Sequence, residues 1–286
     1  MRYSVLLLSA AIAIPSIVSS QPRPHTAPQK SGYARVNGLR MYYERYGAGG
    51  TPLVLIHGGG STIGTNFGRV LPMLARTRRV IAVEVQAHGH TLDIDRPFTF
   101  EQDADDVAAL LDSLGVPKAD VLGFSNGGTT ALQIAVRHPT KVNRLVMASS
   151  NYRRDGMVDG FWDAMQKGTY GDMPQPYKDA YLAINPSQAG VHALYERDSK
   201  RMLAFKEIPD ESIRAIQAPT LVVDGDRDVI RVEHALALSK LLPHARLAVL
   251  PGTHGEYLGE IMTPKVSDRR VRIFADLVAE FLDGGE

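Results

Sequence analysis

The 286-residue chain contains no cysteine. Disulfide bonds, thiol nucleophiles and thiolate metal sites are therefore excluded. An excess of charge is also lacking, because 32 basic residues stand against 31 acidic residues and the formal net charge is +1. Proteins that bind nucleic acid present clustered basic residues. No basic block occurs here, so a nucleic-acid partner is not expected.

A hydrophobic run long enough to span a membrane comfortably, which takes about 20 residues, is lacking too. The most apolar segment is at the start, where Arg2 precedes the short apolar run 5–14 and a small-residue end. This pattern predicts a signal peptide over 1–20, cleaved between Ser20 and Gln21, and an exported protein, periplasmic or secreted. An uncleaved anchor is the alternative, but stable membrane insertion is not expected. The proline-rich segment 21–32 is predicted to be a flexible linker.

The rest of the chain alternates short apolar runs with segments of helical periodicity. Residues 34–47 have the pattern of an antiparallel hairpin, with Asn37–Gly38 at its turn. Six further apolar runs are typical of strands buried on both faces. The pattern predicts an α/β fold: a mostly parallel sheet of about eight strands, with helices on both faces. The six runs are 52–57, 79–85, 119–124, 144–150, 220–225 and 246–250.

Residues 151–215 interrupt this alternation. They contain no clear apolar strand, but they hold Trp162, the only tryptophan, and five of the eleven tyrosines. We expect a helical cap inserted between two strands of a core formed by 33–150 and 216–286. Ligands of open α/β sheets bind outside the carboxyl ends of the strands. A cap in this position would cover that region and select the substrate.

A serine lies where one of the predicted strands passes into a helix. Gly123-Phe-Ser125-Asn-Gly127 has the G-x-S-x-G spacing, with the apolar run 119–124 before it and a helical pattern after it. This context is that of a nucleophile elbow, in which a sharp turn exposes the serine hydroxyl at the end of the sheet. The helix that follows offers free N–H groups to a developing negative charge. Ser125 is therefore the candidate nucleophile.

An acid and a histidine follow the last two predicted strands. The loop after 220–225 contains Asp226 and Asp228, with Asp224 just before it, and the loop after 246–250 contains His254. Parallel strands share a direction, so both loops should emerge at the edge where Ser125 lies. The order serine, aspartate, histidine is the order found with a nucleophile elbow. His234 and His244 compete with His254, but neither of them ends a strand.

Five motifs together resemble the α/β-hydrolases that carry a cap, over residues 33–283. The motifs are HGGG at 57–60, AHGHT at 87–91, GFSNGG at 123–128, GDRD at 225–228 and GTHG at 252–255. The pattern departs at 84–91, where relatives have an aspartate and an arginine–glycine pair before the histidine and a serine after it. Since this loop borders the pocket in relatives, the departure bears on the substrate and not on the catalytic residues.

The resemblance implies a role for each candidate. Ser125 is the nucleophile, His254 the general base and acid, and Asp228, the last acid of its motif, orients His254. The N–H groups of Gly59 and Asn126 form the oxyanion hole. Gly60 is the alternative to Gly59 there, and His57 is expected to brace the loop.

The expected activity is hydrolysis of a carboxylic ester of a small or medium acyl substrate, with no cofactor. No metal is expected either, because His88 and His90 lack a nearby set of further ligands. Hydrolysis of an amide or an N-terminal peptide bond, opening of a lactone and cleavage of a carbon–carbon bond stay open as alternatives within the fold. So do a cofactor-free perhydrolase or acyltransferase and, outside enzymes, a low-turnover ligand-binding module.

Overall fold

The computed structural model describes residues 27–284. The predicted signal peptide, and the predicted linker up to residue 26, lie outside the described residues. The sheet opens with the hairpin of β1 (Lys30–Val36) and β2 (Leu39–Tyr46), which turns through Asn37 and Gly38 with φ of 47° and 84°. Because Lys30 pairs with Arg45, residues 30–32 belong to the sheet and not to a linker.

Eight strands form one sheet in the order β1-β2-β4-β3-β5-β6-β7-β8. β1 and β2 pair antiparallel, as do β2 and β4, and the other neighbours are parallel. The predicted mostly parallel sheet of about eight strands is confirmed. The six strands after the hairpin are β3 (Leu53–Ile56), β4 (Val80–Glu84), β5 (Ala119–Phe124), β6 (Val142–Ala148), β7 (Thr220–Gly225) and β8 (Ala245–Leu250).

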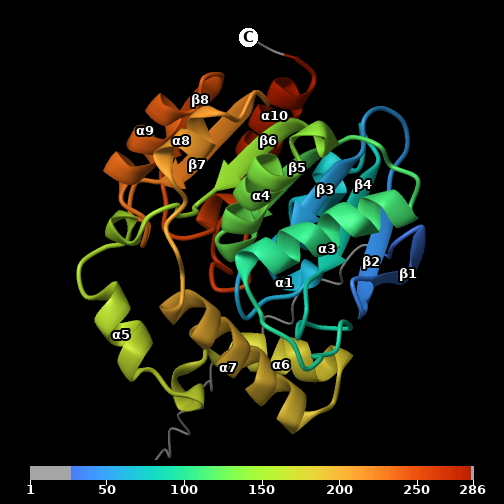
Figure 1. The fold of residues 1–286 in the computed structure, drawn as a ribbon, viewed down its shortest axis with the longest axis vertical. Helices are drawn as coiled ribbons and strands as arrows, with labels where there is room; N and C mark the ends of the chain where they lie inside the picture. The colour runs from blue at the N-terminus through green and yellow to red at the C-terminus, as the bar shows by residue number, and fades with distance from the viewer. Residues whose placement is uncertain (1–26, 285–286) are drawn as a thin grey trace, which may run out of the picture.

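Helices cover both faces of the sheet, as predicted, because alternate residues of the buried strands point to opposite sides. In β3, Val54 and Ile56 face one apolar cluster, and Leu53 and Leu55 face the other. The first cluster includes residues of α3 (Phe100–Ser113), α4 (Asn126–Arg137) and α9 (Val232–Leu241). The second includes residues of α1 (Ile63–Phe67), α2 (Leu71–Leu74) and α10 (Asp268–Leu282). Figure 1 shows α3 and α4 in front of the sheet.

Four helices lie between β6 and β7. They are α5 (Phe161–Lys167), α6 (Gln175–Ile184), α7 (Gln188–Leu203) and α8 (Asp210–Arg214). In Figure 1, α5, α6 and α7 lie apart from the sheet at the bottom of the view, whereas α8 lies beside α9. Ile208, Ile213 and Ile216 join the apolar cluster under α9, which explains the position of α8. We therefore use "the cap" for residues 161–203, a shorter segment than the predicted 151–215.

Four single-turn helices complete the fold: Pro139–Lys141, Arg154–Gly156, Tyr170–Asp172 and Glu256–Leu258. Across residues 27–284, no helix combines the length and apolar character that crossing a membrane requires.

Candidate active site

Ser125 lies at a strained turn between β5 and α4. Its φ of 54° and ψ of −124° place a non-glycine residue in a rarely occupied conformation. A β-carbon at Gly123 would collide with the carbonyl oxygen of Gly127, and one at Gly127 would collide with that of Ile56. The Ser125 N–H donates to the Ala148 carbonyl at 2.8 Å, which ties the turn to β6. The two glycines therefore allow the close approach that exposes the serine at the sheet edge.

The three predicted residues meet at this edge. The Ser125 Oγ lies 3.0 Å from His254 Nε2, and His254 Nδ1 lies 2.7 Å from Asp228 Oδ1. A carboxylate only accepts hydrogen bonds, so Nδ1 carries the proton and Nε2 accepts from the serine hydroxyl. This is the tautomer that a general base next to Ser125 requires.

The competing residues have other partners. Asp226 accepts from the Gly252 N–H at 2.7 Å, and Asp224 accepts from the Gly225 N–H at 2.9 Å. The His234 Nε2 accepts the Tyr152 N–H at 3.1 Å. Of Asp224, Asp226 and Asp228, only Asp228 contacts His254.

Asp228 is held by residues that the sequence motifs do not include. Its Oδ2 accepts from Ser149 Oγ at 2.6 Å and its Oδ1 accepts from the Ile230 N–H at 3.1 Å; the Tyr257 hydroxyl lies 2.6 Å from the same Ser149 Oγ. Burial opposes the charge, but His254 and these hydrogen bonds outweigh it and hold the pKa of Asp228 below its ordinary value. Burial, and next the Asp228 carboxylate, raise the pKa of the neighbouring Asp224. Asp228 therefore carries the negative charge that His254 needs.

The glycine-rich loop after β3 is braced by His57. Its Nε2 accepts the Val85 N–H at 3.2 Å, and its Nδ1 lies 2.8 Å from the Gly58 carbonyl oxygen, to which it donates. Burial lowers the pKa of His57 to about 3, so this side chain is neutral. The Gly58 N–H donates to Asn66 Oδ1 at 2.6 Å. These contacts fix the start of the loop beside Ser125.

Gly59 and Gly60 differ in what their N–H groups contact. The Gly60 N–H donates to Asp198 Oδ2 at 2.5 Å, so it is not available to a substrate. Within residues 27–284 no acceptor is found for the Gly59 N–H. A β-carbon added at Gly59 would lie 2.6 Å from Asn126 Nδ2, so this residue lies against the first residue of α4. Gly59 and Asn126, the two predicted oxyanion donors, are therefore adjacent.

Ser125 and His254 open into a cavity of about 430 Å³ between the sheet edge and the cap. Its wall is mostly apolar, and no lysine or arginine lines it. Asp172 and Asp198 are the acidic residues of the wall. The apolar and aromatic side chains are Met157, Phe161, Ala164, Met165, Met173, Pro174, Tyr177, Leu194, Tyr195, Met202, Val229 and Ile230.

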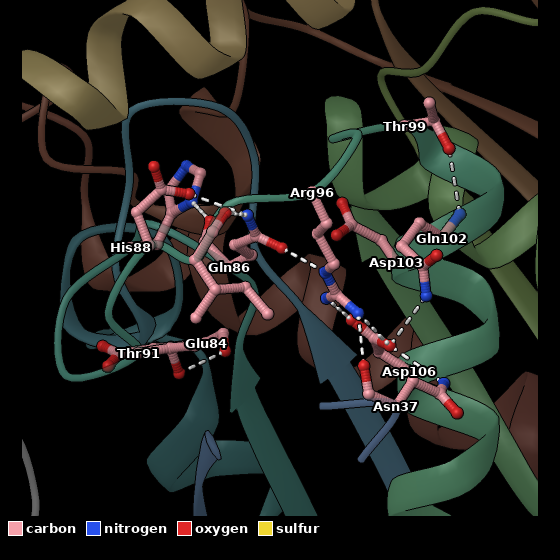
Figure 2. A network of polar contacts seen from close by, with 12 residues as sticks. Asn37, Glu84, Gln86, His88, Thr91, Arg96, Thr99, Gln102, Asp103 and Asp106 are labelled. Carbon is pink, nitrogen blue, oxygen red and sulfur yellow. Dashed lines mark hydrogen bonds and ion pairs between the residues drawn. The ribbon is translucent and has the colours of Figure 1, made fainter. Parts of the chain in front are cut away.

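The loop at 84–96 includes residues 84–91, whose pattern departs from the family motif, and polar contacts fix it to the core. Figure 2 shows Arg96 between Gln86 on the loop and Asp106 on α3. Arg96 Nε donates to Gln86 Oε1 at 2.6 Å, its guanidinium pairs with Asp106, and Asn37 Nδ2 donates to Asp106 Oδ1 at 2.9 Å. The buried side chain of His88 therefore extends from a loop that is fixed to the core.

No group of three or more side chains that could hold a metal ion was found in the described part of the chain. The His90 Nδ1 contacts Glu84 at 2.9 Å, as a pair and not as part of a larger set.

The chain is similar to several known proteins. Residues 51–175 match the alpha/beta hydrolase fold family. The chain is 29% identical to the serine hydrolase BPHL of Homo sapiens, over 80% of this chain and 81% of that protein. It is 28% identical to the 2-hydroxymuconate semialdehyde hydrolase of Pseudomonas sp. (strain CF600), over 91% of this chain and 96% of that protein. A serine hydrolase involved in carbazole degradation (the CarC enzyme) superposes with a TM-score of 0.71 and 25% identity, over 89% of this chain and 98% of that structure.

The chain belongs to the α/β-hydrolase fold family. The resemblance noted from its five motifs is thereby confirmed, and the three proteins named above are hydrolases.

Proposed function

We propose that this protein is a serine hydrolase that cleaves a carboxylic ester through an acyl-enzyme. The observation that carries the proposal is the continuous hydrogen-bonded chain from Ser125 through His254 to Asp228, with steps of 3.0 and 2.7 Å. A serine hydroxyl becomes an effective nucleophile when an oriented base takes its proton.

The proposed reaction has two halves. The Ser125 Oγ attacks the ester carbonyl carbon while its proton passes to His254 Nε2, and the resulting oxyanion accepts the N–H groups of Gly59 and Asn126. His254 then gives the proton to the departing alcohol. In the second half a water molecule, deprotonated by His254, attacks the acyl-enzyme, and Ser125 regains its proton as the acid leaves.

The cavity wall favours an uncharged ester over an anionic substrate. Among the described residues that line the wall there is no lysine or arginine, so a substrate carboxylate would find no cationic side chain there other than a protonated His254. Burying an unpaired carboxylate costs several kcal/mol, typically about 3–5. The apolar side chains suit a neutral acyl chain, which gains roughly 0.8 kcal/mol for each buried methylene.

Cleavage of a carbon–carbon bond is the second candidate. It is favoured by the similarity, over 91% of this chain, to a 2-hydroxymuconate semialdehyde hydrolase. The two candidates make opposite predictions for charge, because a muconate semialdehyde carries a carboxylate and a p-nitrophenyl ester does not.

The experiment combines labelling with a substrate panel. Wild-type protein and Ser125→Ala are treated with a fluorophosphonate probe, and turnover is measured on p-nitrophenyl esters, a lactone, an aminoacyl amide and a 2-hydroxymuconate semialdehyde. We expect labelling of the wild type alone and the highest kcat/KM on an ester. Absence of labelling in the wild type would favour a binding module, and a higher kcat/KM on the semialdehyde would favour the second candidate.

The base is tested in the same assay. His254→Ala should lower kcat by orders of magnitude, and the double variant with Ser125→Ala should be little worse, because groups that act as a unit are not additive. His244→Ala is the matched control, since His244 is exposed on the loop before β8. Near-normal turnover of His254→Ala would contradict the assignment of the base.

A further inference from the structure

A second group of charged side chains is buried next to the glycine-rich loop, outside the Ser125–His254–Asp228 set. It consists of Asp198 and Arg201 on cap helix α7, His88 on the 84–96 loop and Asp103 on α3. Their side chains are 12%, 3%, 0% and 1% exposed, respectively. Buried charges are costly unless they are paired, so an arrangement of this kind calls for a reason.

Arg201 ties the cap helix to the core. Its guanidinium donates to Asp103 Oδ2 at 2.5 Å and also pairs with Asp198 on its own helix. The same guanidinium lies over the rings of Phe98 and Phe100, at 4.2 and 4.6 Å. Such contacts of a cation with an aromatic face are stabilising when they are shielded from water. They hold α7 at one height above the sheet edge.

Held there, the Asp198 carboxylate accepts hydrogen bonds from three separate segments of the chain. Oδ2 accepts the Gly60 N–H at 2.5 Å and lies 2.9 Å from His88 Nε2, while Oδ1 pairs with Arg201. His88 Nδ1 lies 2.8 Å from the Gln86 carbonyl oxygen. Both ring nitrogens of His88 thus face acceptors, so both donate and the ring is an imidazolium.

The charges around His88 agree with this protonation. Burial alone would lower the pKa of His88, and Arg201 lowers it further, but the Asp198 carboxylate outweighs both and the pKa is raised. For Asp198, burial opposes ionisation, but Arg201 and His88 dominate and the pKa lies well below its ordinary value. The ring of His57, 4.7 Å from that of His88, is neutral. Asp198 is therefore a carboxylate clamped between two cations.

The Gly59–Gly60 peptide lies between this carboxylate and α4. A β-carbon on Gly59 would lie 3.1 Å from Asp198 Oδ2 on one side and 2.6 Å from Asn126 Nδ2 on the other. Gly60 has a φ of 67°, in the left-handed region that glycine adopts readily. Because glycine also adopts other conformations readily, contacts with other residues decide how this peptide is oriented. The hydrogen bond from the Gly60 N–H to Asp198 is such a contact. This hydrogen bond fixes the Gly59–Gly60 peptide, which follows directly on the Gly58–Gly59 peptide that carries the Gly59 N–H.

We propose that Asp198 is a positioning residue for catalysis: by accepting the Gly60 N–H, it sets the glycine-rich loop so that the Gly59 N–H faces the carbonyl oxygen of a substrate at Ser125. This inference rests on the proposed function, because it assigns the Gly59 N–H to the oxyanion hole. It couples the seating of α7 on the core to the assembly of the oxyanion hole. The cap then takes part in the chemical step as well as enclosing the substrate.

The inference is tested with two substitutions that change Asp198 in different ways. Asp198→Asn keeps the shape, but whichever way its amide is turned, an NH2 group faces one of the donors that the carboxylate accepts. Asp198→Glu keeps the charge beside His88 and Arg201, which favours folding, but it moves the carboxylate away from Gly60 by one methylene. Glu196→Gln is the matched control, because Glu196 lies on the exposed side of α7 and, among residues 27–284, its side chain contacts only Lys200, at 3.3 Å.

For each variant, active sites are counted with the fluorophosphonate probe, and kcat and KM are measured per labelled site on a p-nitrophenyl ester. We expect both Asp198 variants to lose about tenfold to a hundredfold in kcat, less than the 10²–10³ lost with a whole oxyanion donor, while KM changes by less than about threefold. The affinity for a trifluoromethyl ketone, which forms the oxyanion, should fall by the same factor as kcat/KM. Glu196→Gln should match the wild type.

Three outcomes separate the hypotheses. A kcat per labelled site within about twofold of the wild type in both Asp198 variants would overturn the positioning role and leave Asp198 as a purely structural group. A rise in KM at constant kcat would also overturn it, because the residue would then act on ground-state binding. Failure of the probe to label wild-type Ser125 would instead refute the proposed function itself.

Discussion

Gly59→Ala is a direct perturbation of the proposed oxyanion hole. The added β-carbon would lie 2.6 Å from Asn126 Nδ2, and ordinary contact begins at 3.4 Å, so the two atoms must separate by about 0.8 Å, through rotation of the Asn126 side chain or through a shift of the loop away from α4. The backbone conformation itself accepts alanine, because Gly59 is not among the residues with positive φ. The substitution therefore acts mainly through its contact with the Asn126 side chain, and to a lesser extent through Asp198 Oδ2, which the new β-carbon would approach to 3.1 Å.

The expected loss follows from hydrogen-bond geometry. Donors act on an oxyanion at roughly 2.7–3.1 Å, and a further separation of this size takes an N–H out of that range. Loss of one donor costs about 2.7–4 kcal/mol, a factor of about 10²–10³ in kcat. The assay is steady-state kinetics on a p-nitrophenyl ester, with active sites counted by fluorophosphonate. Gly32→Ala on β1 is the control, since its β-carbon would meet the Tyr43 side chain at ordinary contact distances of 3.4–3.8 Å.

A double-mutant cycle identifies the cause. Asn126→Ala removes the Nδ2 atom that the new methyl group would strike and keeps the Asn126 N–H. In that background Gly59→Ala should cost less than about tenfold in kcat, so the two substitutions should be strongly non-additive. Equal losses from Gly59→Ala in both backgrounds would refute the steric reasoning, and no loss in the wild-type background would remove Gly59 from the oxyanion hole.

Three further predictions concern the residues that support the site. Burial lowers the pKa of His234 from 6.5 to about 4. The unfolded chain therefore binds the proton more tightly, and the free energy of unfolding falls by roughly 2 kcal/mol as the pH drops from about 7 to 5. Urea denaturation of His234→Gln should lack this part of the pH dependence, and a pH dependence equal to that of the wild type would contradict the prediction. Ser149→Ala removes the 2.6 Å hydrogen bond to Asp228, so we expect a loss of about 1.5–3 kcal/mol in stability and a rise in the pKa of Asp228. The pKa is measured by NMR titration of the Asp228 carboxyl carbon, and an unchanged value would argue against the contact. Gly123→Ala should lower the free energy of unfolding by at least about 2 kcal/mol, because its methyl group would overlap the backbone of α4; a thermal midpoint equal to that of the wild type would exclude the tight turn.

The number of strands in the sheet and their mostly parallel arrangement could be predicted from local sequence patterns, but their order in the sheet could not. Strands such as β3 and β5 are buried on both faces, so they appear as apolar runs that need no knowledge of their neighbours. The positions of Ser125, Asp228 and His254 follow from the same patterns, because each residue lies just beyond a strand of a parallel sheet. The structure brings these three side chains together as the chain order indicates.

The supporting residues could not be predicted in this way. Ser149 and Asp198 make their contacts with residues 79 and 138 positions away in the chain, and no local pattern encodes such a pairing. The predicted cap extends to residue 215, beyond the end of α7 at residue 203, for a related reason. The segment that holds Ile208, Ile213 and Ile216 is short, so its apolar pattern does not distinguish a helix that packs on the core from a helix of the cap.

Helix α7 contributes Leu194, Tyr195 and Met202 to the cavity wall and, from the same two turns, the carboxylate that contacts Gly60. The cap is therefore a poor candidate for wholesale exchange by recombination. Grafting a foreign cap would change the side chains that face the acyl group and would also remove the contact of Asp198 with Gly60. A chimera is therefore expected to lose as much kcat as the Asp198 variants, unless an acid returns to position 198. Natural or directed diversification of this fold should instead proceed by point changes around that acid, on α5, α6 and the free face of α7.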